Sequence, residues 1–293
     1  PYNDAESLGT YWVDLPDFSS SVESLQLQRG VGTSTNGSGA FGASINILTD
    51  AISDKASGEF SNAIGSYNTR KHTLKFSTGK LNDHIELSGR LSQINSDGYI
   101  DRAESDLKSY FLQGSFVKGN TLIKALAFGG HEITYQAWNG IDAQTLENDR
   151  TFNPSGMYED ENGNLRFHED EVDNYKQDHY QLHWNQRINN NWSTNLGLNY
   201  TYGRGYFEQY KEDEDFSEYD LTEITIGSET INSTDLIRRR WLDNDFYVVT
   251  ASVNYKVNNL DMSFGGSFSD YDGDHFGEII WARNASDSEI NDQ

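Results

Sequence analysis

A strict alternation of apolar and polar residues recurs along this sequence and restricts it to β-structure. In residues 192–203 one face carries Trp, Thr, Leu and Tyr, whereas the other carries Ser, Asn, Gly and Thr. Residues 85–93 and 260–269 divide as cleanly. A period of two places every second side chain on the same face of a strand. The sequence therefore predicts strands with one apolar and one polar face.

Nine such segments follow one another, and their connections alternate between short and long. The six noisier segments are residues 58–67, 71–80, 109–118, 121–130, 175–187 and 246–255. Short polar turns alternate with long excursions at residues 94–108, 131–174 and 205–245. Strands of this length, joined by tight turns at one end and long loops at the other, are typical of transmembrane β-barrels. A compact soluble domain rarely contains such long structureless loops.

The composition agrees with a barrel. Hydrophobic residues make up only 35 % of the 293-residue chain, yet it holds 17 Tyr, 15 Phe and 6 Trp. These aromatics argue against disorder, and no apolar run is long enough for a helical membrane span. Several rings fall near predicted strand ends, where aromatic girdles form: Trp184, Trp192, Tyr200, Tyr202, Tyr247 and Tyr255. The alternative is that they are ordinary aromatics of a β-core.

Charge and cysteine content exclude several functions. The net charge of −24 argues against nucleic-acid binding, because the only basic run is Arg238, Arg239 and Arg240. No cysteine is present, so neither a disulfide nor a thiolate metal site can form. The chain starts at Pro1 without a signal-peptide pattern, which predicts a mature or truncated start. The acidic excursions are interpreted as solvated loops or, alternatively, as loops that attract cationic ligands or bind divalent ions.

A glycine-rich segment carries a family resemblance. The run LQLQRGVGTSTNGSGAFGASINI, from Leu25 to Ile47, resembles the end of the plug domain of TonB-dependent outer-membrane receptors. The matching features are an apolar strand, Arg-Gly, a turn of small residues, a Gly/Ala-rich step and Ile-Asn-Ile. Residues 3–12 resemble the preceding plug loop, especially that of Bacteroidota-type receptors. Two positions depart from siderophore receptors, since Val31 replaces a common Pro and Asn36 replaces a ligand-contacting aromatic.

The resemblance implies an all-β fold, a partial transmembrane antiparallel β-barrel with a plug-domain fragment in its lumen. About nine strands of a 22-stranded barrel are expected. Residues 1–55 would be the C-terminal part of the plug, and residues 56–293 the first part of the barrel with long acidic extracellular loops. The start of the plug, its coupling box and the other strands would then lie outside this sequence. The expected location is the outer membrane of a Gram-negative bacterium.

The function implied by the resemblance is TonB-dependent import of a scarce nutrient, with an iron–siderophore or related metal complex as first choice. Two alternatives stay open. One is an oligosaccharide or peptide importer that works with a surface lipoprotein, and the other is a non-transport adhesin or structural barrel. The implied partners are the TonB–ExbB–ExbD energy-coupling complex, outer-membrane lipids and the ligand. No enzyme activity, cofactor or nucleic-acid partner is expected.

The resemblance also suggests site residues. Substrate contacts are expected from Glu6, Ser7, Tyr11, Trp12, Thr33, Thr35 and Asn36. Plug anchoring is expected from Arg29, Gly30, Gly37, Gly39 and Gly42, because the Arg29 guanidinium can pair with carboxylates of the barrel wall. The GxGxxG pattern at residues 37–42 precedes a predicted strand, which excludes a dinucleotide site. His179 and His183 would lie roughly 13 Å apart on a strand, too far to share a metal ion.

Overall fold

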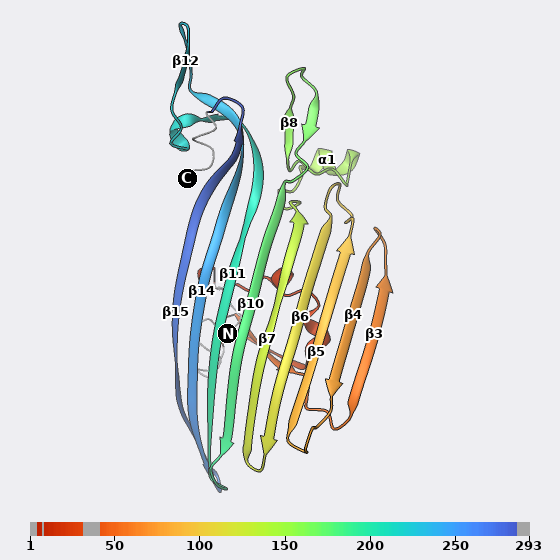
Figure 1. Cartoon of the computed structure of the whole chain (residues 1–293), viewed down its shortest axis with the longest axis vertical. Coiled ribbons are helices and arrows are strands. Elements are labelled where there is room, and N and C mark those ends of the chain that lie inside the picture. The colour runs from red at the N-terminus through yellow and green to blue at the C-terminus, as the bar shows by residue number, and fades with distance from the viewer. Residues whose placement is uncertain (1–4, 8, 32–41, 286–293) are drawn as a thin grey trace.

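The computed structural model describes residues 5–7, 9–31 and 42–285 (Figure 1). Its main element is a nine-stranded antiparallel sheet in which each strand pairs with the next along the chain. In sequence order the strands are β3 (Ala56–Ile64), β4 (Arg70–Thr78), β5 (Ile85–Ser96), β6 (Ser105–Lys118), β7 (Thr121–Tyr135), β10 (Val172–Arg187), β11 (Trp192–Asp215), β14 (Ser233–Val257) and β15 (Leu260–Ala282).

Each of the nine predicted segments overlaps one of these strands, and the sheet stays open. Strands β3 and β15 form its two edges, so the sheet does not close on itself. The prediction of a long loop at residues 205–245 is wrong over much of that range, because β11 continues to Asp215 and β14 begins at Ser233. Cross-strand contacts stabilise this extension, such as the rings of Tyr206 and Trp241, whose centres are 4.6 Å apart. The 22-stranded barrel stays a prediction.

The long connections emerge at one end of the sheet and contain short elements (Figure 1). Between β7 and β10 lie α1 (Ala143–Asn148) and a hairpin of β8 (Met157–Glu159) and β9 (Leu165–Phe167). Between β11 and β14 lie a 3-10 helix η4 (Phe216–Glu218) and a hairpin of β12 (Ile224–Ile226) and β13 (Glu229–Ile231). None of the helices within the described ranges has the length and apolar character to cross a membrane.

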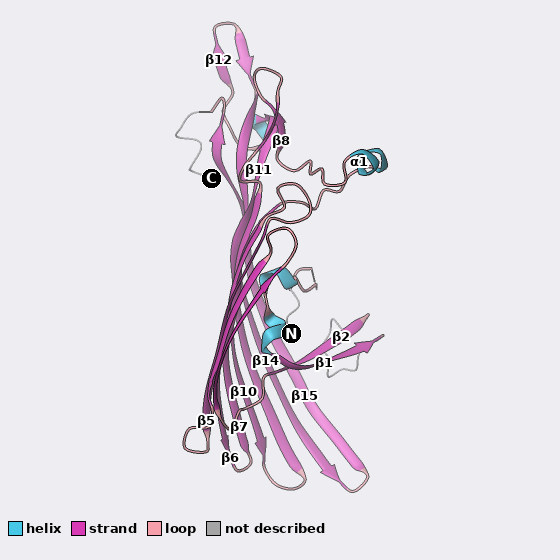
Figure 2. Ribbon diagram, turned by 90° about the vertical axis from the view of Figure 1, so that its right-hand side faces the viewer, coloured by secondary structure: helices cyan, strands magenta, loops and turns pink. Residues whose placement is uncertain are grey.

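The chain before β3, described over residues 5–7, 9–31 and 42–55, is called the N-terminal segment. It contains two 3-10 helices, η1 (Trp12–Asp14) and η2 (Phe18–Ser21), followed by a hairpin of β1 (Val22–Arg29) and β2 (Ala43–Thr49). Figure 2 shows this segment on one side of the curved sheet, here called the concave face. Its identity as a plug fragment stays a prediction.

The opposite, convex face carries two aromatic rows with apolar side chains between them. In the upper row Tyr200 stacks on Tyr180 and Tyr247, with ring centres 6.0 and 4.8 Å apart. In the lower row the rings of Trp192 and Tyr255 are 4.6 Å apart. Eight residues separate the rows along β11, or roughly 26 Å. This separation matches the height of the apolar band that faces lipid in outer-membrane barrels.

Candidate functional site

The candidate functional site is the contact between the N-terminal segment and the concave face, and Asp17 is its main anchor. Asp17 lies between η1 and η2 with a positive φ of 55°, and its carboxylate contacts β4 and β5. The Lys71 ammonium pairs with this carboxylate, and Thr73 Oγ1 and Ser92 Oγ donate to it over 2.9 and 2.5 Å. Burial opposes ionisation, but hydrogen bonds led by that of Lys71 hold the pKa of Asp17 well below its usual range.

Arg90 in β5 supports the same loop from beneath. Its guanidinium Nη1 lies 3.2 Å from the Asp17 carboxylate, and its Nε donates to Ser21 Oγ over 3.0 Å. Arg90 is only 2 % exposed. Ser109 in β6 extends the contact by donating to the Pro16 carbonyl over 2.6 Å. The segment is therefore fixed to three neighbouring strands by buried polar contacts.

An aromatic cluster lies beside this anchor. The Phe18 ring of η2 packs on Phe111 and Phe128 of the sheet, with ring centres 6.2 and 5.3 Å away. Phe128 in turn stacks on His179 at 4.7 Å. His179 is therefore a buried packing residue, and no group of three His, Asp or Glu side chains suited to a metal ion occurs in the described ranges.

The connection from β2 to β3 is fastened at a second place. The Asp50 carbonyl accepts from Gln113 Nε2 over 3.2 Å and from Lys124 Nζ over 3.4 Å, while the Asp50 carboxylate lies 3.1 Å from Lys75 Nζ. The Ser53 amide donates to Glu86 Oε1 over 3.1 Å. The N-terminal segment is thus attached both before and after its β1–β2 hairpin.

Close backbone approach and a buried acid mark the contact of η1 with β7. A Cβ at Gly130 would lie 2.3 Å from the Asp14 carbonyl, so only glycine leaves room for the segment here. The neighbouring Glu132 is 2 % exposed. Burial first, and then the charges of Asp173 and Asp14, raise the pKa of Glu132 to about 9. This environment therefore favours the protonated form of the Glu132 carboxyl group.

Four of the predicted substrate residues lie in the described part of the segment. The Glu6 carboxylate is 3.1 Å from His275 Nε2 on β15, and Ser7 Oγ accepts from the Gly9 amide over 3.1 Å. Tyr11 and Trp12 are 57 % and 47 % exposed. The other three predicted substrate residues fall outside the described ranges: Thr33, Thr35 and Asn36. The ligand role of all seven stays a prediction.

Three of the predicted anchoring residues, Arg29, Gly30 and Gly42, lie in the described ranges, at the far end of the β1–β2 hairpin. The Gly30 amide donates to the Gly42 carbonyl over 2.8 Å, and Gly30 has a positive φ of 88°. Arg29 is exposed, and none of the ion pairs formed within the described ranges includes it. Gly37 and Gly39 lie outside those ranges. The contacts that fasten the described part of the segment come from Asp17 and Asp50 with their partners, which the sequence did not single out. The anchoring role of the five predicted residues stays a prediction.

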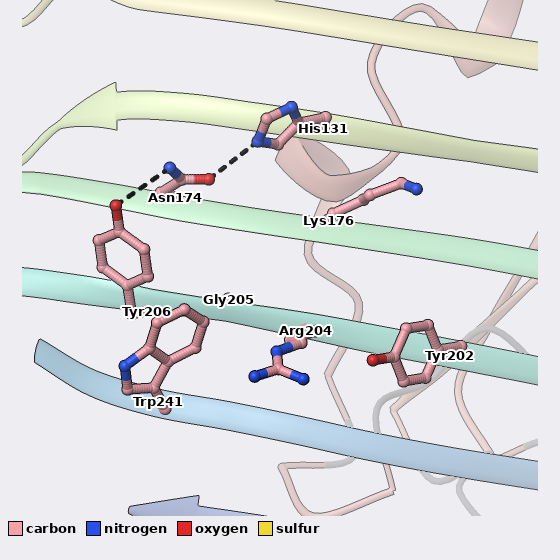
Figure 3. Close-up of a pocket in the computed structure, with 8 residues that line it drawn as sticks. All are labelled: His131, Asn174, Lys176, Tyr202, Arg204, Gly205, Tyr206 and Trp241. Carbon is pink, nitrogen blue, oxygen red and sulfur yellow. Dashed lines mark hydrogen bonds between the residues drawn. The ribbon is translucent and has the colours of Figure 1, made fainter. Parts of the chain in front are cut away.

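A pocket of about 260 Å³ opens on the other face of the sheet (Figure 3). Lys176 and Arg204 line it from the convex side, because each is three residues from a residue of the concave face, His179 or Thr201. Asn174 links two other residues of the pocket lining, because it accepts a hydrogen bond from His131 Nε2 over 2.8 Å and donates one to the Tyr206 hydroxyl over 3.4 Å. The pocket therefore lies apart from the contact with the N-terminal segment.

Comparison with known proteins gives matches among solved structures. The sequence matches no protein-family model, and the search of curated proteins finds no relative. The chain is similar to the siderophore receptor PiuA from Acinetobacter baumannii, with a TM-score of 0.64 and 12 % identity over 92 % of this chain and 38 % of that one. It is also similar to the ferric-catecholate import receptor Fiu from E. coli K12, with a TM-score of 0.58 and 14 % identity over 86 % and 40 %.

A third similar structure is the copper transporter OprC, with a TM-score of 0.62 and 13 % identity over 88 % of this chain and 34 % of that one. This chain therefore spans less than half the length of each of these three structures. Sequence identities this low support a shared fold but do not show which ligand this chain binds. Over the length that they share, the chain has the fold of TonB-dependent receptors.

Proposed function

We propose that this protein is an outer-membrane receptor that imports a scarce nutrient, with an iron–siderophore or related metal complex as its cargo. The observation that carries the proposal is the shared fold with receptors whose names specify siderophores, ferric catecholates or copper. The aromatic rows of the convex face support a position in the outer membrane. The proposal is for a transport receptor and not for an enzyme.

In this proposal residues 1–55 act as the last part of a plug and residues 56–293 as the first part of a barrel wall. Cargo would bind above the segment, where Tyr11 and Trp12 expose their rings. The TonB–ExbB–ExbD complex would supply energy through the earlier part of the plug. Cargo must bind the closed and open states with different affinity, because only a differential affinity shifts their equilibrium.

The two attachments of the N-terminal segment would have different roles during transport. The contacts of Asp50 and Ser53 lie next to the covalent link to β3, so they can persist while the rest of the segment moves. The Asp17 contacts join residues far apart in the chain and would have to break for a path to open. We therefore propose that Asp17 and its partners form the latch, meaning the set of contacts that must break before the proposed plug can move.

The test is titration of the purified protein with ferric siderophores, haem, cobalamin and glycans. We expect affinity for at least one iron complex, weakened roughly tenfold by Trp12→Ala because an exposed ring contact is lost. Trp192→Ala, in the lower convex row, is the matched control and should leave the affinity unchanged. Absence of affinity for every iron complex would overturn the choice of cargo.

Growth of a deletion strain under iron limitation separates import from other roles. Import of an iron complex predicts a growth defect that the wild-type gene restores. An adhesin or structural barrel predicts no defect, and an importer of oligosaccharides or peptides that works with a surface lipoprotein predicts a defect on those nutrients instead.

A further inference from the structure

The three consecutive arginines of β14 differ in their contacts. Arg238 donates to Gln209 Oε1 over 3.0 Å, and Arg239 pairs with Glu208 over 2.8 Å. Arg240 is exposed, and no ion pair within the described ranges includes it. Arg240 therefore differs from Arg239, whose charge is paired with a carboxylate, and from Arg238, whose guanidinium is held by a side-chain amide.

The surroundings of Arg240 are aromatic on one side and open on the other. Its guanidinium carbon lies 5.5 Å from the centre of the Phe207 ring on β11. The Phe207 ring meets the Trp138 ring edge to face at 6.4 Å, and Trp138 is 57 % exposed. On β15 the residue opposite Arg240 is Gly277, where an added Cβ would meet nothing within 4 Å. The position next to Arg240 on β15 therefore carries no side chain and is open on the concave face.

The strand register places these groups on the concave face. Phe207 and Arg240 are cross-strand partners, and Phe207 is six residues from Thr201, whose hydroxyl contacts His179 on the same face. The acidic residue of this row, Asp173, lies on the other side of Phe207, two strands from Arg240.

The N-terminal segment reaches the wall one step below Arg240. His275, which contacts Glu6 over 3.1 Å, is two residues from Gly277 on β15, a distance of roughly 7 Å along a strand. Two residues along a strand also share a face. Arg240 therefore lies directly above the place where Glu6, one of the predicted cargo residues, contacts the sheet.

We propose that Arg240, Phe207 and Trp138 form the wall side of the cargo site and select a ligand with anionic oxygens on planar conjugated groups. This inference rests on the proposed import function and deepens it. The guanidinium presents paired N–H donors that match adjacent anionic oxygens, such as those of a catecholate or a carboxylate. The two rings offer faces and edges on which a planar group packs. The Phe207 ring also orients the guanidinium through a cation–π contact.

The experiment compares two ferric chelates in titrations of the detergent-solubilised protein. One probe is an anionic ferric tris-catecholate, and the other is a neutral ferric tris-hydroxamate. Arg240→Gln should weaken catecholate binding roughly tenfold or more and leave hydroxamate binding within about twofold. Arg240→Lys should restore part of the affinity, because it keeps the charge but not the paired donors. The matched control is Arg204→Gln, an arginine of the convex face paired with Asp243 over 3.0 Å.

A chemical measurement on the wild-type protein avoids any folding defect of the variants. Phenylglyoxal modifies exposed arginines, and mass spectrometry should show less modification of Arg240 when the catecholate probe is bound. Equal catecholate affinity of Arg240→Gln and Arg204→Gln, or no protection of Arg240 in a protein that binds the probe, would overturn the inference while the import function stands.

Failure of the proposed function gives a different result. If the wild-type protein binds neither chelate, the proposed cargo class is wrong, and metal-free benzene-1,3,5-tricarboxylate then becomes the probe. Protection of Arg240 by this tricarboxylate supports the anion site on its own, and no protection overturns it.

Discussion

The Asp17 carboxylate lies 3.2 Å from the Arg90 guanidinium and joins the N-terminal segment to the wall across 73 residues of sequence. Both side chains are almost completely buried, with exposed fractions of 0 % and 2 %. Lys71 brings a second cation to the same carboxylate. A buried charge that loses its partner is far more costly than an exposed one. This pair therefore controls how firmly the segment is seated.

Asp17→Asn should lower the free energy of unfolding by about 3 kcal/mol, because it leaves Arg90 buried without a counter-charge. The amide keeps the shape of the side chain, so the loss reports charge rather than packing. Urea unfolding followed by tryptophan fluorescence measures it, and hydrogen exchange of η2 and β1 should speed up in parallel.

Lys80→Gln is the matched control for Asp17→Asn. Its partner Asp54 is 78 % exposed, so loss of this ion pair should change the free energy of unfolding by less than about 1 kcal/mol. Equal effects of the two substitutions would contradict the assignment of the latch to Asp17.

Glu132→Gln should make the protein more stable at pH 8. The raised pKa of about 9, against an ordinary 4.5, means that the folded protein keeps a proton that the unfolded chain releases. Stability therefore falls as pH rises from 4.5 to 9, and the amide removes this fall. Thermal unfolding should show a melting temperature higher by about 2 °C or more at pH 8, and no gain at pH 4.

Glu208→Gln should have the opposite effect on stability at pH 8. Burial opposes the charge of Glu208, but hydrogen bonds from His168 and Arg239 lower its pKa below the ordinary value. Its contribution is present above pH 4.5 and is lost as pH falls through the lowered pKa. Glu208→Gln should therefore destabilise the protein at pH 8, with a difference that shrinks at lower pH. The same sign for both substitutions would contradict the two pKa directions.

The strands could be predicted from the sequence, but their full lengths could not. Where the convex face is apolar and the concave face is polar, the alternation of apolar and polar residues is clear, as in residues 192–203. Beyond the upper aromatic row both faces of β11 and β14 carry polar groups, so the alternation disappears. There Glu208 and Arg239 stabilise the sheet as a cross-strand ion pair. Such a pair cannot be predicted from the residue pattern of either strand alone.

The latch was equally invisible in the sequence. Asp17 stands in a stretch without periodicity, and its partners Lys71 and Ser92 lie 54 and 75 residues away. Only the strand register brings them together. The basic run was visible, but the alternation of faces on β14 separates Arg239 from Arg240. Composition therefore indicated a cluster, whereas the structure gives these two arginines different surroundings.

Gly130→Ala should displace the N-terminal segment, because the new Cβ would approach the Asp14 carbonyl to 2.3 Å. Overpacking of this kind costs about 1–3 kcal/mol. Limited proteolysis should cleave the segment faster, with the sheet itself still protected. Gly266→Ala on β15 is the control, since nothing lies within 4 Å of its added Cβ. Unchanged cleavage of the segment in Gly130→Ala would argue against a tightly seated η1.

Leu196→Arg should weaken insertion into a bilayer, because Leu196 is midway between the convex rows at Tyr200 and Trp192. An arginine facing lipid near the midplane costs about 2–4 kcal/mol. Urea titration of the protein folded into phospholipid vesicles measures this loss. The neighbouring Asn195 faces the concave side, so Asn195→Arg should cost less than about 1 kcal/mol. Similar losses at both positions would mean that the convex face does not contact lipid, because adjacent residues of one strand differ chiefly in the face they occupy.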